Sequence, residues 1–433
     1  MLQSSVYCDR VGDEKMSALT DFQADIPKRV RVLVLGGGIH GAGVLHDMAS
    51  RGWKDVHLVE KNKLGLGTSG RSTKLVHGGL RYLKRISDFH LVKEALSERA
   101  LLLKNVPDLV KPIELYLPIL KKGGMPGYMA KVGLSLYDGL SGQQKIALHK
   151  KLSIEQAREM APLLNYDLFK SVYSYWDAQT DDHRLVRRVA ASAVKLGAGV
   201  SENCRALRVA KTDDGFEVVV ECQGKTQAIS AKYVVNCLGP WAHELFADGG
   251  IEPQFTGINN RGSHLVFQDM GLKVGFFLQS NNDSRIFFML PWEGYTLLGT
   301  TEALQKSSAD DLQTKPEEVQ LLINMANKYL NVPLRENDIL EAFTGLRWLA
   351  VEKGKSLTKT SRAHVVSELP SGRGVLYTLY GGKLTTYRSL SEEIGDLIMS
   401  HFGEVCPSKT SDSASWASAN EVPQGELPVL KRW

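Results

Sequence analysis

The chain has 433 residues, of which 43% are hydrophobic, and its formal net charge at pH 7 is +5. A chain of this length can bury the cores of two or three domains. The mild positive charge, from 53 basic against 48 acidic residues, does not indicate nucleic acid as a partner. The five cysteines are dispersed without metal-ligand spacing, which favours buried thiols in a reducing compartment.

The two ends of the sequence differ in composition from its middle. Residues 1–28 form a polar extension without the apolar core of a secretory signal, which favours a cytoplasmic protein. Residues 404–433 are rich in Ser, Pro and Ala and are expected to form a loosely ordered tail. No apolar run reaches the length of about 18 residues that a membrane-spanning helix requires.

The strongest local pattern lies near the start, in RVRVLVLGGGIHGAGVLHDMASRGW. Residues 30–35 are typical of a buried parallel strand, and Gly36, Gly38 and Gly41 then fit G-x-G-x-x-G. A helix and a second short strand follow, and that strand ends at Glu60. Glycines allow the backbone to approach a pyrophosphate at the helix N-terminus, and the acid can accept hydrogen bonds from a ribose. This order of elements predicts a dinucleotide site.

The next segment, residues 67–84, reads GTSGRSTKLVHGGLRYLK. It contains four cations, one histidine and no acid, which is unusual for a surface helix. We interpret it as an anion-binding loop at a flavin site. Thr68, Ser69, Ser72 and Lys74 are expected to line the FAD pyrophosphate or the isoalloxazine, although small hydroxyl side chains equally suit turns.

Two later segments each combine a strand, a glycine turn and a helix. AKYVVNCLGPWAHELF is interpreted as a second crossover that turns at Gly239. GVLYTLYGGKLTTYRSLSEEIGDLI predicts a turn at Gly382 and a helix opening at Thr385 or Thr386, whose N-terminus is suited to stabilise negative charge on a reduced flavin. Ala206 lies where a third strand should present backbone atoms to the adenine. For the segment that turns at Gly382, the alternative is a plain βα connection. For Ala206, the alternative is simple packing.

Several motifs occur in one order: GGGIHGAG, GTSGRSTKLVHGGLRYL, YWDAQTDDHRL, NCLGPW, GSHLV, PWEGYTLLGTTE, GLRWL and YGGKLTTYR. Over residues 29–403 they closely resemble FAD-dependent glycerol-3-phosphate dehydrogenase, a family within the D-amino-acid-oxidase-like flavoproteins. The resemblance implies FAD as cofactor and an α/β fold, with a Rossmann-type FAD-binding domain and a substrate domain built on an antiparallel sheet. The family usually continues into a C-terminal helical domain, which the printed sequence lacks.

The resemblance also implies that both domains are discontinuous in sequence. The FAD-binding domain is expected over residues 29–112, 177–250 and 342–403. The substrate-binding domain is expected over residues 113–176 and 251–341. Within the latter, RIFFMLPWEGYTLLGTTE has the pattern of a β-hairpin.

The family reaction oxidises sn-glycerol 3-phosphate to dihydroxyacetone phosphate. Hydride passes to flavin N5, while a base takes the hydroxyl proton. A bound phosphate favours arginine forks and other cations. By motif match, the implied substrate-binding residues are Arg81, Tyr82, Arg347, Arg362 and Lys383.

Two histidines match active-site positions of the family. His264 is expected to be the base, and His77 to hydrogen-bond flavin or substrate, since a neutral imidazole is a fitting base near pH 7. Arg347 completes the candidate catalytic set, although a guanidinium releases its proton poorly. Lys383 is also expected beside the flavin. Each histidine, taken alone, equally suits a structural role.

Other functions remain open at this point. Trp348 and Ala363 depart from the family pattern beside proposed phosphate ligands, so another phosphorylated or anionic alcohol is an alternative substrate. An amine or amino-acid oxidase that produces peroxide is a second reading, and a non-catalytic flavin-binding protein a third. A homodimer is compatible with the sequence.

The electron acceptor is quinone or oxygen on these readings. The segment between residues 118 and 151 contains six lysines but only one acidic residue, with apolar residues interleaved. Such a segment could dock on anionic lipid headgroups, which would make the protein peripheral on the inner face of a membrane. A solvated basic face is the alternative. The lysines are Lys121, Lys122, Lys131, Lys145, Lys150 and Lys151.

Overall fold

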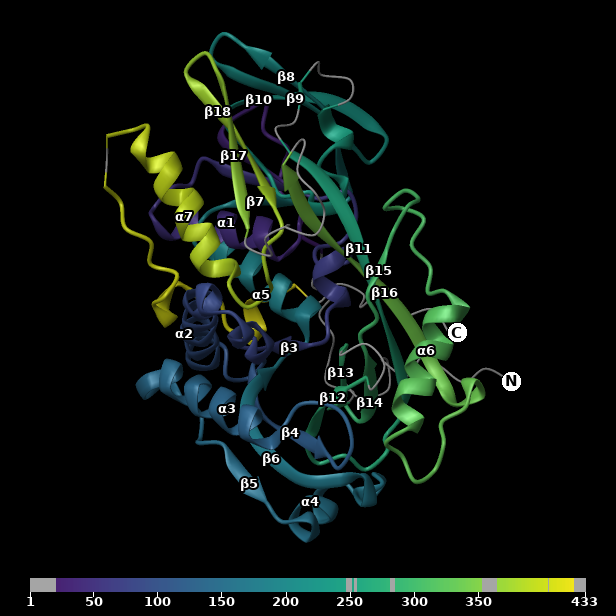
Figure 1. Cartoon of the computed structure of the whole chain (residues 1–433). Coiled ribbons are helices and arrows are strands. Elements are labelled where there is room, and N and C mark those ends of the chain that lie inside the picture. Colours follow the sequence, from purple (N-terminus) through teal and green to yellow (C-terminus); the bar gives the residue numbers. More distant parts are fainter. Residues whose placement is uncertain are drawn as a thin grey trace. The chain divides into compact units, whose positions relative to one another are not determined.

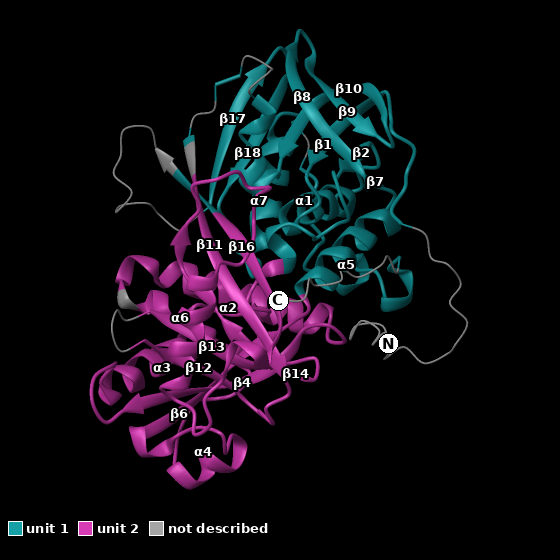
Figure 2. Ribbon diagram, turned by 90° about the vertical axis from the view of Figure 1, so that its right-hand side faces the viewer, with its two compact units in different colours: residues 1–70, 182–257, 348–431 teal, residues 71–181, 258–347, 432–433 magenta. Residues whose placement is uncertain are grey.

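The structure is a computed structural model. It describes residues 21–246, 251–252, 255–280, 285–352, 364–403 and 405–423. The chain divides into two compact units, coloured separately in Figure 2. The first unit comprises residues 1–70, 182–257 and 348–431, and the second comprises residues 71–181, 258–347 and 432–433.

The first unit is built on a largely parallel sheet, in the strand order β17-β18-β10-β1-β2-β7. β1 pairs in parallel with β10 and β2, and β18 and β7 extend the parallel part on either side. Its strands are β1 (Arg29–Leu35), β2 (Val56–Val59), β7 (Gly199–Ser201), β8 (Cys204–Thr212), β9 (Gly215–Cys222), β10 (Lys225–Asn236), β17 (Val365–Ser371) and β18 (Gly374–Tyr380). The Rossmann-type arrangement predicted from the sequence is confirmed.

Three helices of this unit pack together, as Figure 1 shows for α1 and α7. They are α1 (Ile39–Ser50), α5 (Asp182–Lys195) and α7 (Tyr387–Ser400). α1 is buried along almost its whole length because α5 and α7 both contact it. A buried ion pair between Arg51 and Asp47, at 2.6 Å, lies where α1 meets α7.

β8 and β9 form an antiparallel pair that continues through β9 to β10. Cys204 and Cys222 lie opposite each other on this pair and form a disulfide. The expectation of thiols is therefore wrong for these two residues. Cys237 and Cys406 are free, and Cys8 lies outside the described residues.

The expectation of a loosely ordered tail is wrong for residues 405–423. Trp416 is buried, stacks edge-on against His46 with ring centroids 5.2 Å apart, and donates from Nε1 to the Thr410 carbonyl. The backbone N–H of Ala417 donates to Ser192 on α5. Polar composition misled the prediction, because a few buried contacts to α1 and α5 are sufficient to order the segment.

The second unit is built on a mostly antiparallel sheet, in the strand order β15-β11-β14-β13-β12-β4-β6-β3, with β16 beside β11 and β5 beside β6. The strands are β3 (Leu75–Val76), β4 (Lys111–Leu120), β5 (Lys150–Leu152), β6 (Phe169–Gln179), β11 (Phe255–Gln268), β12 (Gly275–Gln279), β13 (Ile286–Trp292), β14 (Tyr295–Gly299), β15 (Ala303–Leu304) and β16 (Ile339–Glu352). The predicted hairpin is confirmed as β13–β14. The predicted antiparallel substrate-domain sheet is confirmed as well.

The helices of the second unit are α2 (Phe89–Asn105), α3 (Gly127–Ser141), α4 (Ile154–Met160) and α6 (Pro316–Asn327). A core rich in aromatic residues joins α4 and α6 to the sheet, with Phe276, Phe287 and Tyr329 among its members. In the part of the chain that the structure describes, every helix is too short or too polar to cross a bilayer.

The unit boundaries differ from the expected domain boundaries. Residues 71–112, expected in the FAD-binding domain, belong to the second unit, where β3 and β4 both pair with β6. Residues 177–181 and 342–347 also belong to the second unit. The cause is strand pairing, since β6 continues to Gln179 and β16 begins at Ile339.

Candidate active site

The cofactor candidates of the first unit follow the carboxyl ends of its parallel strands. β1 leads into Gly36, β10 leads toward Gly239 and β18 leads into Gly382. Because these strands are parallel neighbours, the three glycine turns emerge at one edge of the sheet. Open parallel sheets bind their ligands at that edge.

The first turn requires glycine at two positions. A Cβ on Gly41 would lie 1.9 Å from the Gly36 carbonyl oxygen, so α1 can follow β1 only if residue 41 has no side chain. Gly36 itself has φ of +100°, a left-handed conformation that favours glycine. α1 then begins at Ile39, directly after this turn, with no side-chain cap from Gly38. These features fit the pyrophosphate of FAD.

Glu60 fastens this turn from the end of β2. Its Oε2 accepts from the Gly37 N–H at 2.6 Å, and its Oε1 accepts from the Asn62 N–H at 2.9 Å. Burial raises the pKa of Glu60, while these two backbone hydrogen bonds oppose the rise. Each carboxylate oxygen keeps a second lone pair, so the predicted ribose contact stays available.

Ser69 and Ser72 make specific local bonds. Ser69 Oγ accepts from the Ile39 N–H at 2.9 Å and so closes the loop over the start of α1. Ser72 Oγ accepts from the Lys74 N–H at 3.0 Å, which is the turn role that the sequence left open. Thr68 lies in the same short turn as Ser69. Their contacts with a cofactor stay predictions.

Ala206 lies on β8, beside the strand end that carries Glu60. The Cys204 N–H at the start of β8 donates to the Glu60 carbonyl at 2.8 Å. The pairing of β8 with β9 shifts register between Ala206 and Arg208. Contact of the Ala206 backbone with adenine stays a prediction.

The turn after β18 is shaped by glycine as well. Gly382 has φ of +92°, and a Cβ on it would lie 2.4 Å from His40 Nε2 in the first turn of α1. The helix begins at Tyr387, with Thr386 at the N-cap. Lys383 precedes it and accepts at its carbonyl from the Thr386 N–H. Sequence reasoning missed His40, whose pKa burial lowers to about 4.

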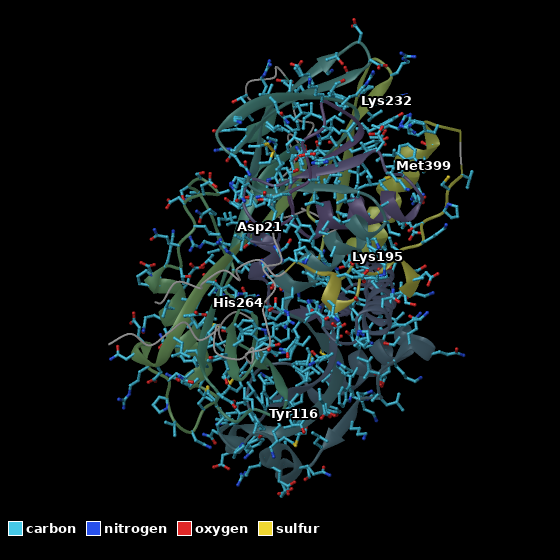
Figure 3. The ribbon with its side chains drawn as sticks, turned by 180° about the vertical axis from the view of Figure 1, so that it is seen from behind. Asp21, Tyr116, Lys195, Lys232, His264 and Met399 are labelled. Carbon is cyan, nitrogen blue, oxygen red and sulfur yellow. A yellow bond between two sulfur atoms is a disulfide. The ribbon has the colours of Figure 1, made fainter. Side chains whose placement is uncertain are left out.

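The catalytic candidates of the second unit centre on His264, on β11 (Figure 3). The side chain is 1% exposed, and its ring stacks on Phe343 with centroids 4.9 Å apart and planes at 14°. Gly299 is its cross-strand partner on β14, and a Cβ there would lie 2.2 Å from His264 Cδ2. Thr73 Oγ1 lies 2.9 Å from Nε2. The ring is therefore held on one face, at its Cδ2 edge and at one nitrogen.

Two cations act on this ring. Burial is the main cause that lowers the pKa of His264 well below its usual value, and the charges of Arg347 and Lys74 lower it further. Lys74 is buried with its Nζ 5.1 Å from the Trp292 ring centre. Arg347 is exposed, and its Nη2 lies 3.3 Å from where a Gly262 Cβ would be. The structure thus brings together three residues far apart in sequence, with His264 neutral at pH 7.

His77, Arg81 and Tyr82 lie on the continuation of the same loop. Gly78, next to His77, donates its N–H to Tyr137 Oη at 2.9 Å and to Asp177 Oδ1 at 3.2 Å. Arg81 lies over the Tyr82 ring at 5.1 Å. Convergence of Arg81, Tyr82 and Lys383 on one phosphate stays a prediction. Arg362 and Ala363 lie outside the described residues.

Sequence reasoning missed the residues that hold the candidates in place. Arg99 and Tyr137 both bond Asp177 at 2.7 Å, beneath the turn beside His77. Thr73 and Phe343 hold His264. The sequence contains no signal for these roles, because each depends on a partner that the fold brings from a distant segment.

Comparison with known proteins places this geometry in a family. The family model described as FAD dependent oxidoreductase matches residues 31–388. D-erythritol 1-phosphate dehydrogenase of Brucella abortus is 33% identical over 407 residues, which cover 93% of this chain and 78% of that protein. Aerobic glycerol-3-phosphate dehydrogenase of Escherichia coli is 32% identical over 389 residues, which cover 88% of this chain and 76% of that protein.

A solved structure agrees with these sequence matches. The glycerol-3-phosphate dehydrogenase of Bacillus halodurans, complexed with FAD, has a TM-score of 0.72 and 27% identity. The match covers 90% of this chain and 69% of that one. The glycine turns before α1 and α7 fit that cofactor. The chain belongs to the FAD-dependent oxidoreductase family, and its cofactor is FAD.

Proposed function

We propose that the protein oxidises a secondary alcohol of a phosphorylated polyol, such as sn-glycerol 3-phosphate or D-erythritol 1-phosphate, to the ketone. The observation that carries this proposal is the buried imidazole of His264, which Phe343 and Thr73 hold in place and on which the charges of Arg347 and Lys74 act. The reaction requires a base for the hydroxyl proton and cations for the phosphate. The names of the two relatives support this substrate class.

The charged Arg347 and the neutral His264 would have different roles. Arg347 would hold the substrate's phosphate, since a guanidinium presents a fork of donors to phosphate oxygens. His264 would receive the proton of the hydroxyl group. FAD, when bound, supplies the acceptor for the hydride that leaves the same carbon. Alcohol minus hydride and proton gives the ketone, so the step balances.

A panel of substrates tests this proposal. The holoenzyme is mixed anaerobically with phosphorylated polyols, with the same polyols lacking phosphate, and with amino acids. Bleaching of the yellow flavin by a phosphorylated polyol alone is the expected result. Bleaching by an amino acid, with peroxide released on admitting air, would instead establish the amine-oxidase alternative.

We also propose that electrons pass on to a membrane quinone, with α3 lying against anionic lipid. Tyr128, Met129 and Val132 on α3 are 72%, 50% and 65% exposed, and Lys131 is exposed among them. Leu134 and Tyr137 point into the core instead. A helix face with large apolar side chains and lysine suits the boundary between headgroups and acyl chains. Sedimentation with anionic vesicles, absent with neutral ones, is the expected outcome.

A further inference from the structure

Thr73 is a residue that neither the motifs nor the family resemblance singled out. It precedes the buried Lys74, and its Oγ1 lies 2.9 Å from His264 Nε2. Thr73 is half-buried, whereas the imidazole of His264 is closed off. Thr73 is therefore the more accessible of the two residues in this contact.

The other ring nitrogen of His264 offers no route for a proton. Nδ1 is buried, and among the described residues it has no hydrogen-bond partner. Phe343 covers one face of the ring, and the Cδ2 edge lies against Gly299. A proton that reaches this imidazole must then enter at Nε2, where Thr73 is the neighbour.

We propose that Thr73 is a further catalytic residue, which relays the substrate's hydroxyl proton to His264. In this step the substrate O–H proton moves to Thr73 Oγ1, while the Thr73 hydroxyl proton moves to His264 Nε2. FAD, when bound, would accept the hydride from the substrate carbon as the C=O bond forms. The products are the ketone, reduced FAD and an imidazolium, so atoms and electrons balance. The inference rests on the proposed function and adds the path by which the substrate's proton reaches His264.

The relay requires one tautomer of His264. Nε2 must be the bare nitrogen that accepts from the Thr73 hydroxyl, so the ring hydrogen must lie on Nδ1. In the opposite tautomer Nε2–H would donate to Thr73, and the ring could not take a proton by this route. The tautomer of His264 in the resting holoenzyme therefore tests the relay without any turnover of substrate.

Thr73→Val removes the hydroxyl group while keeping the shape, and Thr73→Ser restores the hydroxyl. The relay predicts that Thr73→Val slows anaerobic flavin reduction at saturating substrate by about 100-fold, within the range that proton transfer contributes. Substrate affinity should change little, because Thr73 carries no charge for the phosphate. Thr73→Ser should stay within roughly fivefold of the unmodified rate. An unchanged rate in Thr73→Val would overturn the relay.

Thr344→Val is the matched control. Thr344 also belongs to the second unit, where it is buried, and its hydroxyl forms hydrogen bonds with those of Ser263 at 2.7 Å and Thr314 at 2.9 Å. Its loss should lower stability without slowing flavin reduction appreciably. Equal slowing in Thr344→Val and Thr73→Val would show that both changes act through structure, against the relay.

A nitrogen spectrum keeps this inference separate from the proposed function. Holoenzyme with ¹⁵N-histidine is recorded with and without His264→Gln, which assigns the His264 signals, and then as Thr73→Val. The expected result is hydrogen on Nδ1, with an Nε2 shift that moves in Thr73→Val. Hydrogen on Nε2 would refute the relay even if phosphorylated alcohols reduce the flavin. Failure of every alcohol to do so, with the expected tautomer present, would refute the proposed function alone.

Discussion

The cofactor cradle and the His264 cluster are built in different ways. In the cradle, backbone geometry dominates, as the 1.9 Å approach of a Gly41 Cβ to the Gly36 carbonyl shows. In the cluster, side chains from β11, β16 and the loop before β3 meet around one ring. Backbone requirements leave a local pattern in the sequence, whereas side chains that converge leave none.

This difference predicts the largest effect at Gly41. Gly41→Ala places a methyl group on the Gly36 carbonyl, so α1 must shift and the cradle cannot approach a pyrophosphate. We expect the FAD content of the purified protein to fall from about one per chain to near zero. Absorbance of the purified protein measures it.

The control for that substitution is Gly133→Ala on α3, where the added Cβ would meet nothing within 4 Å beyond its chain neighbours and the adjacent backbone of its own helix. This variant should keep its flavin. Full flavin content in Gly41→Ala would mean that the turn does not constrain FAD binding.

The next effect concerns affinity for the phosphate group. Arg347→Met removes a charged donor, and a hydrogen bond to a charged group contributes enough to raise the Kd of a phosphorylated substrate by roughly 10- to 100-fold. The Kd of the same polyol without phosphate should rise much less. Titration of the flavin spectrum with each compound measures both, and Arg373→Met, at an exposed side chain, is the control. Equal losses for the two compounds would remove Arg347 from phosphate binding.

A smaller effect is expected in the pH dependence. His264 must be neutral to accept a proton, so the rate rises with pH through its pKa. Burial, Arg347 and Lys74 hold this pKa low in the free protein. A bound dianion would offset the two cations and so raise the pKa of His264 in the complex. The acid limb of kcat should therefore lie at higher pH than that of kcat/KM, and coincident limbs would contradict it.

The smallest effect is expected on α3. Lys131→Gln removes one cation from the face that carries Tyr128 and Met129. One lysine near a membrane surface contributes about 1 kcal/mol, so affinity for anionic vesicles should fall about fivefold. Lys225→Gln, at an exposed position in the first unit, is the control. Equal binding by all three proteins would argue against α3 as the docking face.

The fold and the cradle could be predicted because strands, glycine turns and the acid at position 60 follow each other locally. The hairpin β13–β14 was predictable for the same reason. The assignment of residues 71–112 failed, because pairing of β3 and β4 with β6 depends on distant segments. The prediction of a loosely ordered tail failed as well, because the contact between Trp416 and His46 exists only in the folded chain.

In the candidate site, family resemblance pointed to His264 and Arg347, and the structure places them in one electrostatic cluster with Lys74. Thr73 could not be predicted, since a threonine in a polar loop has many unremarkable roles. The role proposed for Thr73 depends on its 2.9 Å contact with His264, which lies 191 positions away in the sequence.

The most direct test of the central claim is the rate of anaerobic flavin reduction in His264→Gln with FAD bound. A phosphorylated polyol that bleaches the unmodified holoenzyme should reduce this variant about 100-fold or more slowly, because the proton has no acceptor. His90→Gln, at an exposed histidine on α2, should react normally. Reduction of His264→Gln at the unmodified rate, with its flavin retained, would contradict the account.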